Sequence, residues 1–309
     1  MKVVWLGWEE VYTTRRVQEA ARQQGLDLLV CNIHDIQFDI EERRANLRAF
    51  GESLLEHWDG LVVRTFYPYI SEALTVARLF RDAGKVVIDQ SLTDEGYAVS
   101  KMHDTLVLTA HGLPCPRTWQ LFNPRQVEAL AEQLRYPCVL KGVHGARGEH
   151  TYLIHSTEQL HRRLWHYTYG ELMLQEYLPA EEDYRVLVIG FRALPVMVSR
   201  RPPAGDFRTN HSLGGTFIAR TLQEFPGFGP LAEAAARALR REITAVDLRM
   251  KGSEPMILEV NRQPDFEGFE RATGFDVAAE VVRYIRERLK QTNAAPHLQL
   301  KADASPSRP

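Results

Sequence analysis

The first ninety residues alternate between short apolar runs and longer segments in which apolar positions recur at helical spacing. Four apolar runs are predicted to be strands, at residues 2–7, 26–33, 60–66 and 85–90. Helical spacing lies between them at 14–25 and 71–84, and a further helix is expected around Leu47, Phe50, Leu54 and Leu55. Strands that alternate with helices predict βαβ units and a parallel sheet.

The pattern changes after about residue 92. A helix that begins near Ser100 is expected to end at Gly112, with prolines beyond it. Residues 137–154 then predict a strand, a glycine-containing loop and a second strand, which is an antiparallel hairpin without a crossover helix. More strands follow closely, at 172–178, 183–190, 191–201, 242–250 and 254–260, with a helix at 230–243. The sequence therefore predicts an α/β unit followed by an α+β region.

The amino-acid composition argues against some classes of binding partner. The 309 residues have a formal charge of -2 and a pI near 6.6, so no basic field indicates nucleic acid or an anionic membrane as the main partner. No run approaches the roughly 18 apolar residues of a membrane span, and the three separated cysteines indicate reduced thiols. A cytoplasmic protein is expected, with a flexible tail from about residue 291, where Ala, Pro, Ser and charged residues show no periodicity.

Two oxygen-bearing side chains, Glu259 and Asn261, end an apolar strand two positions apart and so share one of its faces. If the connection to the preceding strand comprises residues 251–255, pairing puts Asp247 opposite Glu259, whereas a register shifted by one turns Asp247 to the other face. These ligand types suit a hard cation such as Mg²⁺. Two alternatives remain open, a strand end that merely faces water and an ion pair of Asp247 with Arg249.

Lys141 follows the apolar residues PCVL and precedes a loop that contains Gly145 and Gly148. A lysine inside an apolar strand is costly unless it is paired. Beside glycines, which let backbone N–H groups approach an anion, it suits nucleotide phosphates. An ordinary glycine hairpin is the alternative. The loop is not a Walker A loop, and no G-x-G-x-x-G follows the first strand, so a dinucleotide-dependent oxidoreductase is unsupported.

Two connections in the second half carry candidate binding groups. The segment QEYL, residues 175–178, begins a hinge whose backbone suits an adenine edge, with a nearby acid for the ribose hydroxyls, although an ordinary loop is the alternative. The segment SRRPPAGDFRTNHSLGG gathers Arg200, Arg201, Arg208 and Asn210 around turn residues. Arginine offers a fork of donors for carboxylate or phosphate, against the alternative of a solvated basic loop.

Two long sequence motifs are more specific evidence than any of these single residues. GDFRTNHSLGG at 205–215 and LEVNRQPDFEGFERATGFDVA at 258–278 resemble the patterns G-D-F-R-x-N-x-x-x-G-G and M-E-V-N-x-x-P-x-x-E-G-x-E-x-x-T-G-x-D of the RimK-like carboxylate-amine ligases, within the ATP-grasp superfamily. The resemblance extends to about residue 290. It implies an ATP-grasp fold, with an N-terminal parallel-sheet pre-ATP-grasp domain (1–92) and two α+β subdomains that clasp ATP (93–176 and 177–290), before the tail (291–309).

The resemblance also implies roles for individual residues. The positions that match nucleotide-binding residues are Lys101, Lys141, Gly145, Gly148, Gln175, Glu176, Tyr177 and Asp183. Arg208 and Asn210 match positions near the reacting phosphates, and Arg200 and Arg201 match a basic pair in the substrate region. Asp247, Glu259 and Asn261 match the ligands of Mg²⁺ or Mn²⁺.

The chain departs from the family pattern at two places. In the glycine loop, His144 and His150 replace residues that are commonly acidic or glycine in relatives, which bears on how that loop closes. The segment SKMHDT lacks the frequent R-D-K wording, but Lys101 aligns when residues are counted back from HGLPCPRT.

The activity that the resemblance implies is ATP-dependent amide formation through an acylphosphate, without a covalent enzyme intermediate or a catalytic nucleophile. The partners would be ATP, an amino acid such as glutamate, and a carboxylate on a protein, peptide or cofactor, in a self-associating protein. Arg64, at the end of an N-terminal strand, is a candidate for a substrate carboxylate, with a surface arginine as the alternative. A peptide or glutathione-type ligase and a nucleotide-binding regulatory protein without ligase activity are the competing functions.

Overall fold

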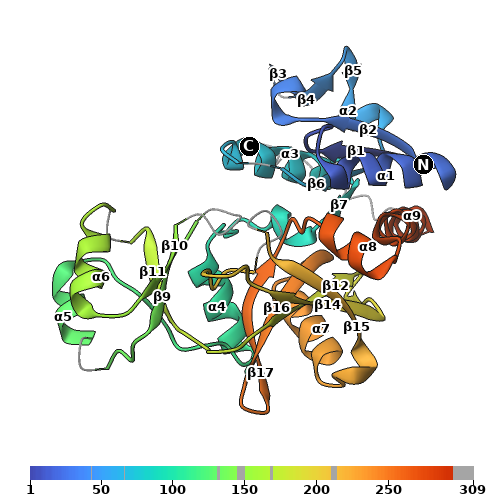
Figure 1. Ribbon diagram of the computed structural model, residues 1–309. Helices are drawn as coiled ribbons and strands as arrows, with labels where there is room; N and C mark the ends of the chain where they lie inside the picture. Colours follow the sequence, from blue (N-terminus) through green and yellow to red (C-terminus); the bar gives the residue numbers. More distant parts are fainter. Residues whose placement is uncertain are drawn as a thin grey trace.

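The computed structural model describes residues 1–294 apart from 43, 66, 131–132, 145–149, 168–169 and 210–213. Its secondary structure forms three regions, an N-terminal one in blue, a central one in green and a C-terminal one in yellow to red (Figure 1). None of the helices in the described part of the chain combines the length and the apolar character that a membrane crossing requires. The expected order, an α/β unit followed by α+β regions, is confirmed.

The N-terminal region is a parallel sheet in the order β2-β1-β6-β7. Its elements are β1 (Lys2–Leu6), α1 (Tyr12–Gln23), β2 (Asp27–Cys31), β6 (Gly60–Val63), α3 (Ile70–Asp82) and β7 (Val86–Ile88), as the apolar runs predict. Side chains alternate along β1, so Val3 and Trp5 enter the core on the α1 face while Val4 and Leu6 enter the core on the α3 face. Both faces are therefore buried, as parallel sheets require.

The predicted helix around Leu47 to Leu55 is wrong. A short 3-10 helix, η1 (Ile33–Asp35), leads into an antiparallel sheet of β3 (Gln37–Glu41), β4 (Arg44–Ala49) and β5 (Glu52–Ser53), followed by the four-residue helix α2 (Leu54–His57). Leu47 and Leu54 are fully buried, but a tight turn with positive φ at Phe50 and Gly51 separates them. Their spacing of seven suits one helix face as well as two elements joined by a turn.

The central region is an antiparallel sheet in the order β10-β9-β11-β8, and the predicted hairpin at 137–154 is confirmed. Its elements are β8 (Thr118–Gln120), α5 (Pro124–Leu130), β9 (Cys138–Gly142), β10 (Thr151–Ile154), α6 (Thr157–Leu164) and β11 (Leu172–Glu176). Residues of α5 and α6 join those of the strands in one apolar core.

The C-terminal region is a larger antiparallel sheet in the order β15-β14-β12-β16-β17, with β13 paired to β12. Its elements are β12 (Asp183–Ile189), β13 (Arg192–Ala193), β14 (Val196–Arg201), β15 (Thr216–Thr221), η4 (Leu222–Glu224), α7 (Phe228–Ala238), β16 (Ile243–Lys251), β17 (Glu254–Asn261), α8 (Glu267–Thr273) and α9 (Val277–Ala294). One face packs on α7, and on α4 (Lys101–Ala110), which precedes the central sheet in sequence. The boundaries at 93, 177 and 291 stay predictions, although residues 291–294 are helical and 295–309 lie outside the described residues.

The other face of the C-terminal sheet shares a single core with the N-terminal region. Residues of β12, β14 and β16 join those of α8, α9, α1 and the parallel sheet in this core. The 3-10 helix η2 (Gln90–Thr93) follows β7 at the same junction. α9 packs along α1, so the last described helix lies beside the first (Figure 1).

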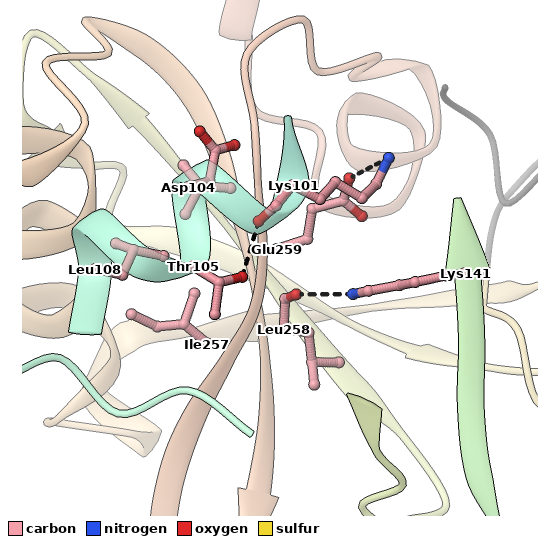
Figure 2. A pocket seen from close by; sticks show the side chains of 9 residues that line it. Lys101, Asp104, Thr105, Leu108, Lys141, Ile257, Leu258 and Glu259 are labelled. Carbon is pink, nitrogen blue, oxygen red and sulfur yellow. Dashed lines mark hydrogen bonds and ion pairs between the residues drawn. The ribbon is translucent and has the colours of Figure 1, made fainter. Parts of the chain in front are cut away.

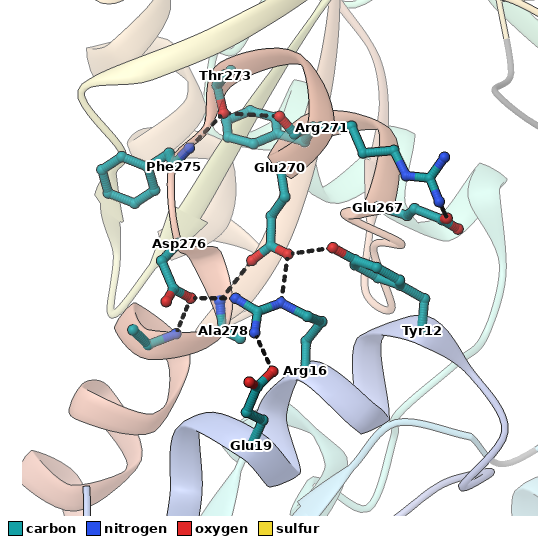
Figure 3. A network of polar contacts seen from close by, with 12 residues as sticks. Tyr12, Arg16, Glu19, Glu267, Glu270, Arg271, Thr273, Phe275, Asp276 and Ala278 are labelled. Atoms are coloured by element: carbon teal, nitrogen blue, oxygen red, sulfur yellow. Dashed lines mark hydrogen bonds and ion pairs between the residues drawn. The ribbon is translucent and has the colours of Figure 1, made fainter. Parts of the chain in front are cut away.

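Polar contacts at this junction come from the second family-like motif (Figure 3). The carboxylate of Glu270, which is 8% exposed, accepts hydrogen bonds from the Tyr12 hydroxyl at 2.8 Å, from Arg16 Nε at 3.1 Å and from the Ala278 N–H at 3.1 Å. Arg16 also contacts Asp276 at 3.1 Å. Burial and the bond to Glu270 raise the pKa of the Tyr12 phenol. The E-x-x-T-G-x-D part of the motif therefore joins the regions.

We expect Glu270→Ala to lower the free energy of unfolding by about 3 kcal/mol, because one buried carboxylate satisfies three donors. Urea denaturation measures this loss. The control is Arg271→Ala on the same helix, whose side chain is 67% exposed and pairs with Glu267 one turn earlier, and which should change stability by less than about 0.5 kcal/mol. Equal losses in the two variants would contradict the role given to Glu270.

Candidate active site

The hairpin of β16 and β17 carries the predicted metal ligands. Its turn is formed by Gly252 and Ser253, with φ +63° at Gly252, where a two-residue turn favours glycine. The register from this turn would pair Asp247 with Leu258, but a β-bulge shifts it and Asp247 pairs with Glu259. The predicted pairing is confirmed, whereas the five-residue connection from which it was derived is wrong.

Asp247 is 6% exposed and is surrounded by donors. Arg185 on β12 contacts both of its oxygens at 2.8 Å, Arg200 on β14 lies at 3.1 Å, and the Asn261 amide donates at 3.1 Å. Burial alone would raise the pKa of the Asp247 carboxyl, but Arg185 and Arg200 lower it to about 2. The alternative in which Asp247 pairs with Arg249 is not what the structure shows, because Arg249 contacts Asp183 at 3.6 Å.

The two predicted lysines reach the same strand from different elements (Figure 2). Lys101, in the first turn of α4, has its ammonium 3.6 Å from Glu259. Lys141 on β9 donates to Gln175 at 3.0 Å and to the Leu258 carbonyl, at the bulge, at 3.4 Å. Burial lowers the pKa of Lys141, while Glu259 opposes that shift. Lys141 thus bridges the central and C-terminal sheets.

These side chains line one pocket between the two sheets. Among the described residues, six cationic side chains and four carboxylates line it: Lys101, Lys141, Arg185, Arg200, Arg208 and Arg249, with Glu176, Asp183, Asp247 and Glu259. The excess of positive charge suits a polyanionic ligand such as a nucleoside triphosphate.

The predicted adenine hinge lies at the edge of this pocket. Gln175 accepts from Lys141 and donates to Thr118 at 3.1 Å, so its side chain is held. Glu176 is bound by Lys251 at 2.6 Å, and the Tyr177 ring lies edge-on to Phe207 with the ring centres 6.4 Å apart. All three hinge residues line the pocket.

Asp183, predicted to approach the ribose, is 4% exposed at the start of β12. It accepts from Arg200 Nε at 2.6 Å and from the Thr209 hydroxyl at 2.6 Å. Arg200 therefore bridges Asp183 and Asp247 across neighbouring strands, and it is 3% exposed. The next residue, Arg201, points to the other side of the strand, where it is exposed and contacts Glu182 at 3.4 Å.

The remaining predicted residues have three different outcomes. Arg208 lines the pocket and is held by Asp206 at 2.8 Å, whereas Gly145, Gly148 and Asn210 lie outside the described residues. Arg64 is not among the residues that line the pocket. It is 8% exposed, so it is not the surface arginine considered above, and its guanidinium donates to main-chain carbonyls.

Three residues that contact the buried carboxylates of the pocket were not predicted as site residues: Arg185, Thr209 and Arg249. Arg185 lies two positions after Asp183 on β12, and Arg249 two positions after Asp247 on β16. Residues two apart share a strand face, so this spacing was the available signal. Thr209 lies in an irregular segment, where no periodicity indicates the direction of its side chain.

The donor set fits a hard divalent ion that binds together with phosphates. Among the described residues, no three His, Cys, Asp or Glu side chains are grouped to hold a metal by themselves. Asp247 and Glu259 supply two carboxylates, and Asn261, whose nitrogen donates to Asp247, has its amide oxygen left to accept. Mg²⁺ is usually held in this way, by one or two carboxylates with phosphate oxygens and waters.

Two family models match most of the sequence. Residues 98–285 match the RimK-like ATP-grasp domain, and residues 1–93 match the RimK PreATP-grasp domain. The chain therefore belongs to the RimK-like ATP-grasp family of ligases, and both the predicted resemblance and the predicted ATP-grasp fold are confirmed.

Relatives cover nearly the whole chain. It is 28% identical over 295 residues to "Probable alpha-L-glutamate ligase 2" of Pseudoalteromonas atlantica, covering 92% of this chain and 95% of that protein. It is 28% identical over 291 residues to "Probable alpha-L-glutamate ligase" of Chromohalobacter salexigens, covering 93% and 95%.

Solved structures show the same fold at lower identity. The ATP-grasp ligase PsnB complexed with a minimal precursor has a TM-score of 0.73 at 18% identity and covers 93% of this chain and 98% of PsnB. A PsnB complex with minimal precursor, Mg and ADP has a TM-score of 0.70 at 17% identity, with coverage of 93% and 98%. The macrocyclase MdnC of Microcystis aeruginosa, bound with its precursor peptide MdnA, has a TM-score of 0.68 at 13% identity and covers 93% of this chain and 100% of MdnC.

We expect Asp247→Asn to destabilise the fold in a pH-dependent way. The pKa of the carboxyl is about 2 in the folded protein against an ordinary 3.8, so the ionised group stabilises the fold above pH 4. That stabilisation is lost as the pH falls from about 4 to 2. The difference in free energy of unfolding between wild type and variant should be roughly 2 kcal/mol larger at pH 6 than near pH 2, by urea denaturation. A difference independent of pH would contradict the ion pairs with Arg185 and Arg200.

Proposed function

We propose that the protein is an ATP-dependent carboxylate-amine ligase that forms an amide through an acylphosphate and adds an amino acid such as glutamate to a carboxylate. The observation that carries the proposal is the convergence of Asp247, Glu259 and Asn261 on one side of a pocket whose other side presents Lys141. The relatives named as probable alpha-L-glutamate ligases support glutamate as the amino acid that is added. The similar structures that are bound to precursor peptides support a peptide or protein as the acceptor.

The proposed reaction has two steps. An oxygen of the acceptor carboxylate attacks the γ-phosphorus of ATP, the bond to the bridging oxygen breaks, and ADP leaves. The nitrogen of the amino acid then attacks the acyl carbon, phosphate leaves, and the nitrogen loses a proton as the amide forms. No side chain needs to form a covalent intermediate. Burial raises the pKa of Cys31, Cys115 and Cys138 to about 11 or 12, which keeps these thiols protonated.

Different residues of the pocket would bind different parts of the substrates. Lys101 and Lys141 would hold the phosphates, Gln175 to Tyr177 the adenine, and Asp183 the ribose. Arg208, with Asn210, would neutralise charge on the transferring phosphoryl group. Arg200 would lie on the substrate side, whereas Arg201, predicted for the same role, points to the other side of its strand. A divalent ion held by Asp247, Glu259 and Asn261 would offset the negative charge of the phosphates. We also propose that the protein associates with further copies of itself.

We expect Glu259→Ala to reduce ADP formation at least about 100-fold, because one of two carboxylates for the ion is lost. ADP release is measured with pairs of acids and amines at several Mg²⁺ and Mn²⁺ concentrations. Glu254→Ala is a matched control, since Glu254 is exposed at the turn end of the same strand and should turn over as wild type. Full metal-dependent turnover by Glu259→Ala would contradict the metal role.

The substrates are tested by incubating the protein with ATP and a pool of metabolites and peptides. We expect an ATP-dependent gain in the mass of one carboxylate compound, and the added mass names the amine. A gain of one glutamyl unit supports the glutamate ligase, whereas another increment indicates a peptide or glutathione-type ligase. Binding of ATP without turnover across the pool would contradict a ligase and favour a regulatory protein.

A further inference from the structure

Residues 262–264, just beyond the candidate metal ligands, are held by hydrogen bonds from the N-terminal region. Arg64, at the carboxyl end of β6, donates from Nη1 to the Arg262 carbonyl at 3.1 Å and from Nη2 to the Pro264 carbonyl at 3.3 Å. The Arg64 backbone is itself fixed, because its N–H donates to the Leu6 carbonyl at 2.8 Å. One planar guanidinium thus sets the path of residues 262–264.

The side chain of Arg262 is held by the segment that follows β7. Its guanidinium contacts Asp89 at 2.8 Å and Ser91 at 3.2 Å, and it lies over the Tyr97 ring at 4.6 Å. The second oxygen of Asp89 accepts from the Glu242 N–H at 2.6 Å and from the Ile243 N–H at 3.2 Å. Asp89 therefore ties the first residue of β16 to the residue after β17.

The carbonyls on the other side of Asn261 are held as well. Arg241 donates to the Val260 carbonyl and contacts Asp104 on α4 at 2.7 Å. The Thr244 hydroxyl donates to the Asn261 carbonyl at 2.7 Å. The main chain is thus fixed immediately before, at and after the candidate amide ligand.

Burying the positive charges of these arginines costs free energy, and few carboxylates lie near enough to offset it. Arg64, Arg241 and Arg262 are each no more than 8% exposed, and the described carboxylates within 4 Å of them are Asp89 and Asp104. Burial lowers the pKa of Arg64 to about 10, and the nearby Arg262 acts in the same direction. Such buried ionic groups add little net stability, and in some proteins they fix one geometry among similar ones.

We infer that Arg64, Asp89 and Arg262 form a clamp by which the N-terminal region positions Asn261 and the metal-binding end of β17. They are positioning residues, and Arg64 acts on the main chain rather than on a substrate carboxylate. The inference rests on the proposed function in one respect, the assignment of Asn261 as a metal ligand. It links the position of the N-terminal region to the geometry of the metal site.

The test compares Arg262→Lys and Arg64→Lys with wild type. Lysine keeps the charge but lacks the planar fork that contacts two partners. We expect the Kd for Mg²⁺, measured by calorimetry with ADP bound, to rise about tenfold, while the Kd for ADP in EDTA changes less than twofold. Amide hydrogen exchange should accelerate in residues 258–264 and not in the central sheet. The milder Ser91→Ala should give the same changes to a smaller degree.

The matched control is Arg240→Lys. Arg240 pairs with Asp94 at 2.7 Å across the same junction, but the pair is about half exposed and does not touch residues 260–264. It should leave both the Mg²⁺ affinity and the exchange pattern unchanged. Wild-type Mg²⁺ affinity and exchange in the clamp variants, or faster exchange spread evenly over the chain, would overturn the inference.

These readouts separate the clamp from the proposed function, because neither ADP binding nor exchange requires turnover. If no acid and amine pair reacts, the proposed function fails while the clamp is still measured. If Glu259→Ala binds Mg²⁺ as wild type does, the metal assignment fails, and local exchange at 258–264 still decides whether the clamp holds the strand.

Discussion

The pairing of Asp247 with Glu259 is the constraint on which the rest of the site depends. It exists because a bulge at Leu258 offsets the register that the two-residue turn begins. Without that offset, Glu259 would face the opposite side of the sheet, since side chains alternate along a strand. The bulge also places the Leu258 carbonyl at 3.4 Å from the Lys141 ammonium. One irregular residue therefore sets both the cross-strand pairing of Asp247 with Glu259 and the hydrogen bond that bridges the sheets.

Electrostatics explains why such a site would bind nucleotide and metal together. In the structure Asp247 is compensated by Arg185 and Arg200, and Glu259 is approached by Lys101. The described residues that line the pocket include more cations than carboxylates, which disfavours binding of a divalent ion alone. The phosphates of ATP would reverse that balance and supply the missing oxygen ligands. The clamp around Asn261 belongs to the same arrangement, because the ion requires near-octahedral geometry from few protein ligands.

How much the sequence reveals follows from the range of each interaction. Periodicity of two placed Glu259 and Asn261 on one face, and apolar runs placed the parallel sheet, because both depend on neighbours in the chain. The bulge, the packing of α4 on the C-terminal sheet and the false helix near Leu47 depend on tertiary contacts that spacing does not encode. Arg185 and Arg249 lie two positions after Asp183 and Asp247, so they carry the same period-two signal as the predicted ligands. The partners of Arg64 lie about two hundred residues away, beyond any local pattern.

The most direct measurement is a crystal structure with Mn²⁺ and a non-hydrolysable ATP analogue, in which anomalous scattering locates the ion. The account predicts a manganese peak that contacts oxygens of Asp247, Glu259 and Asn261 and at least one phosphate oxygen. A peak elsewhere, or a bound nucleotide with Asp247 still enclosed by Arg185 and Arg200 and no ion beside it, would contradict it.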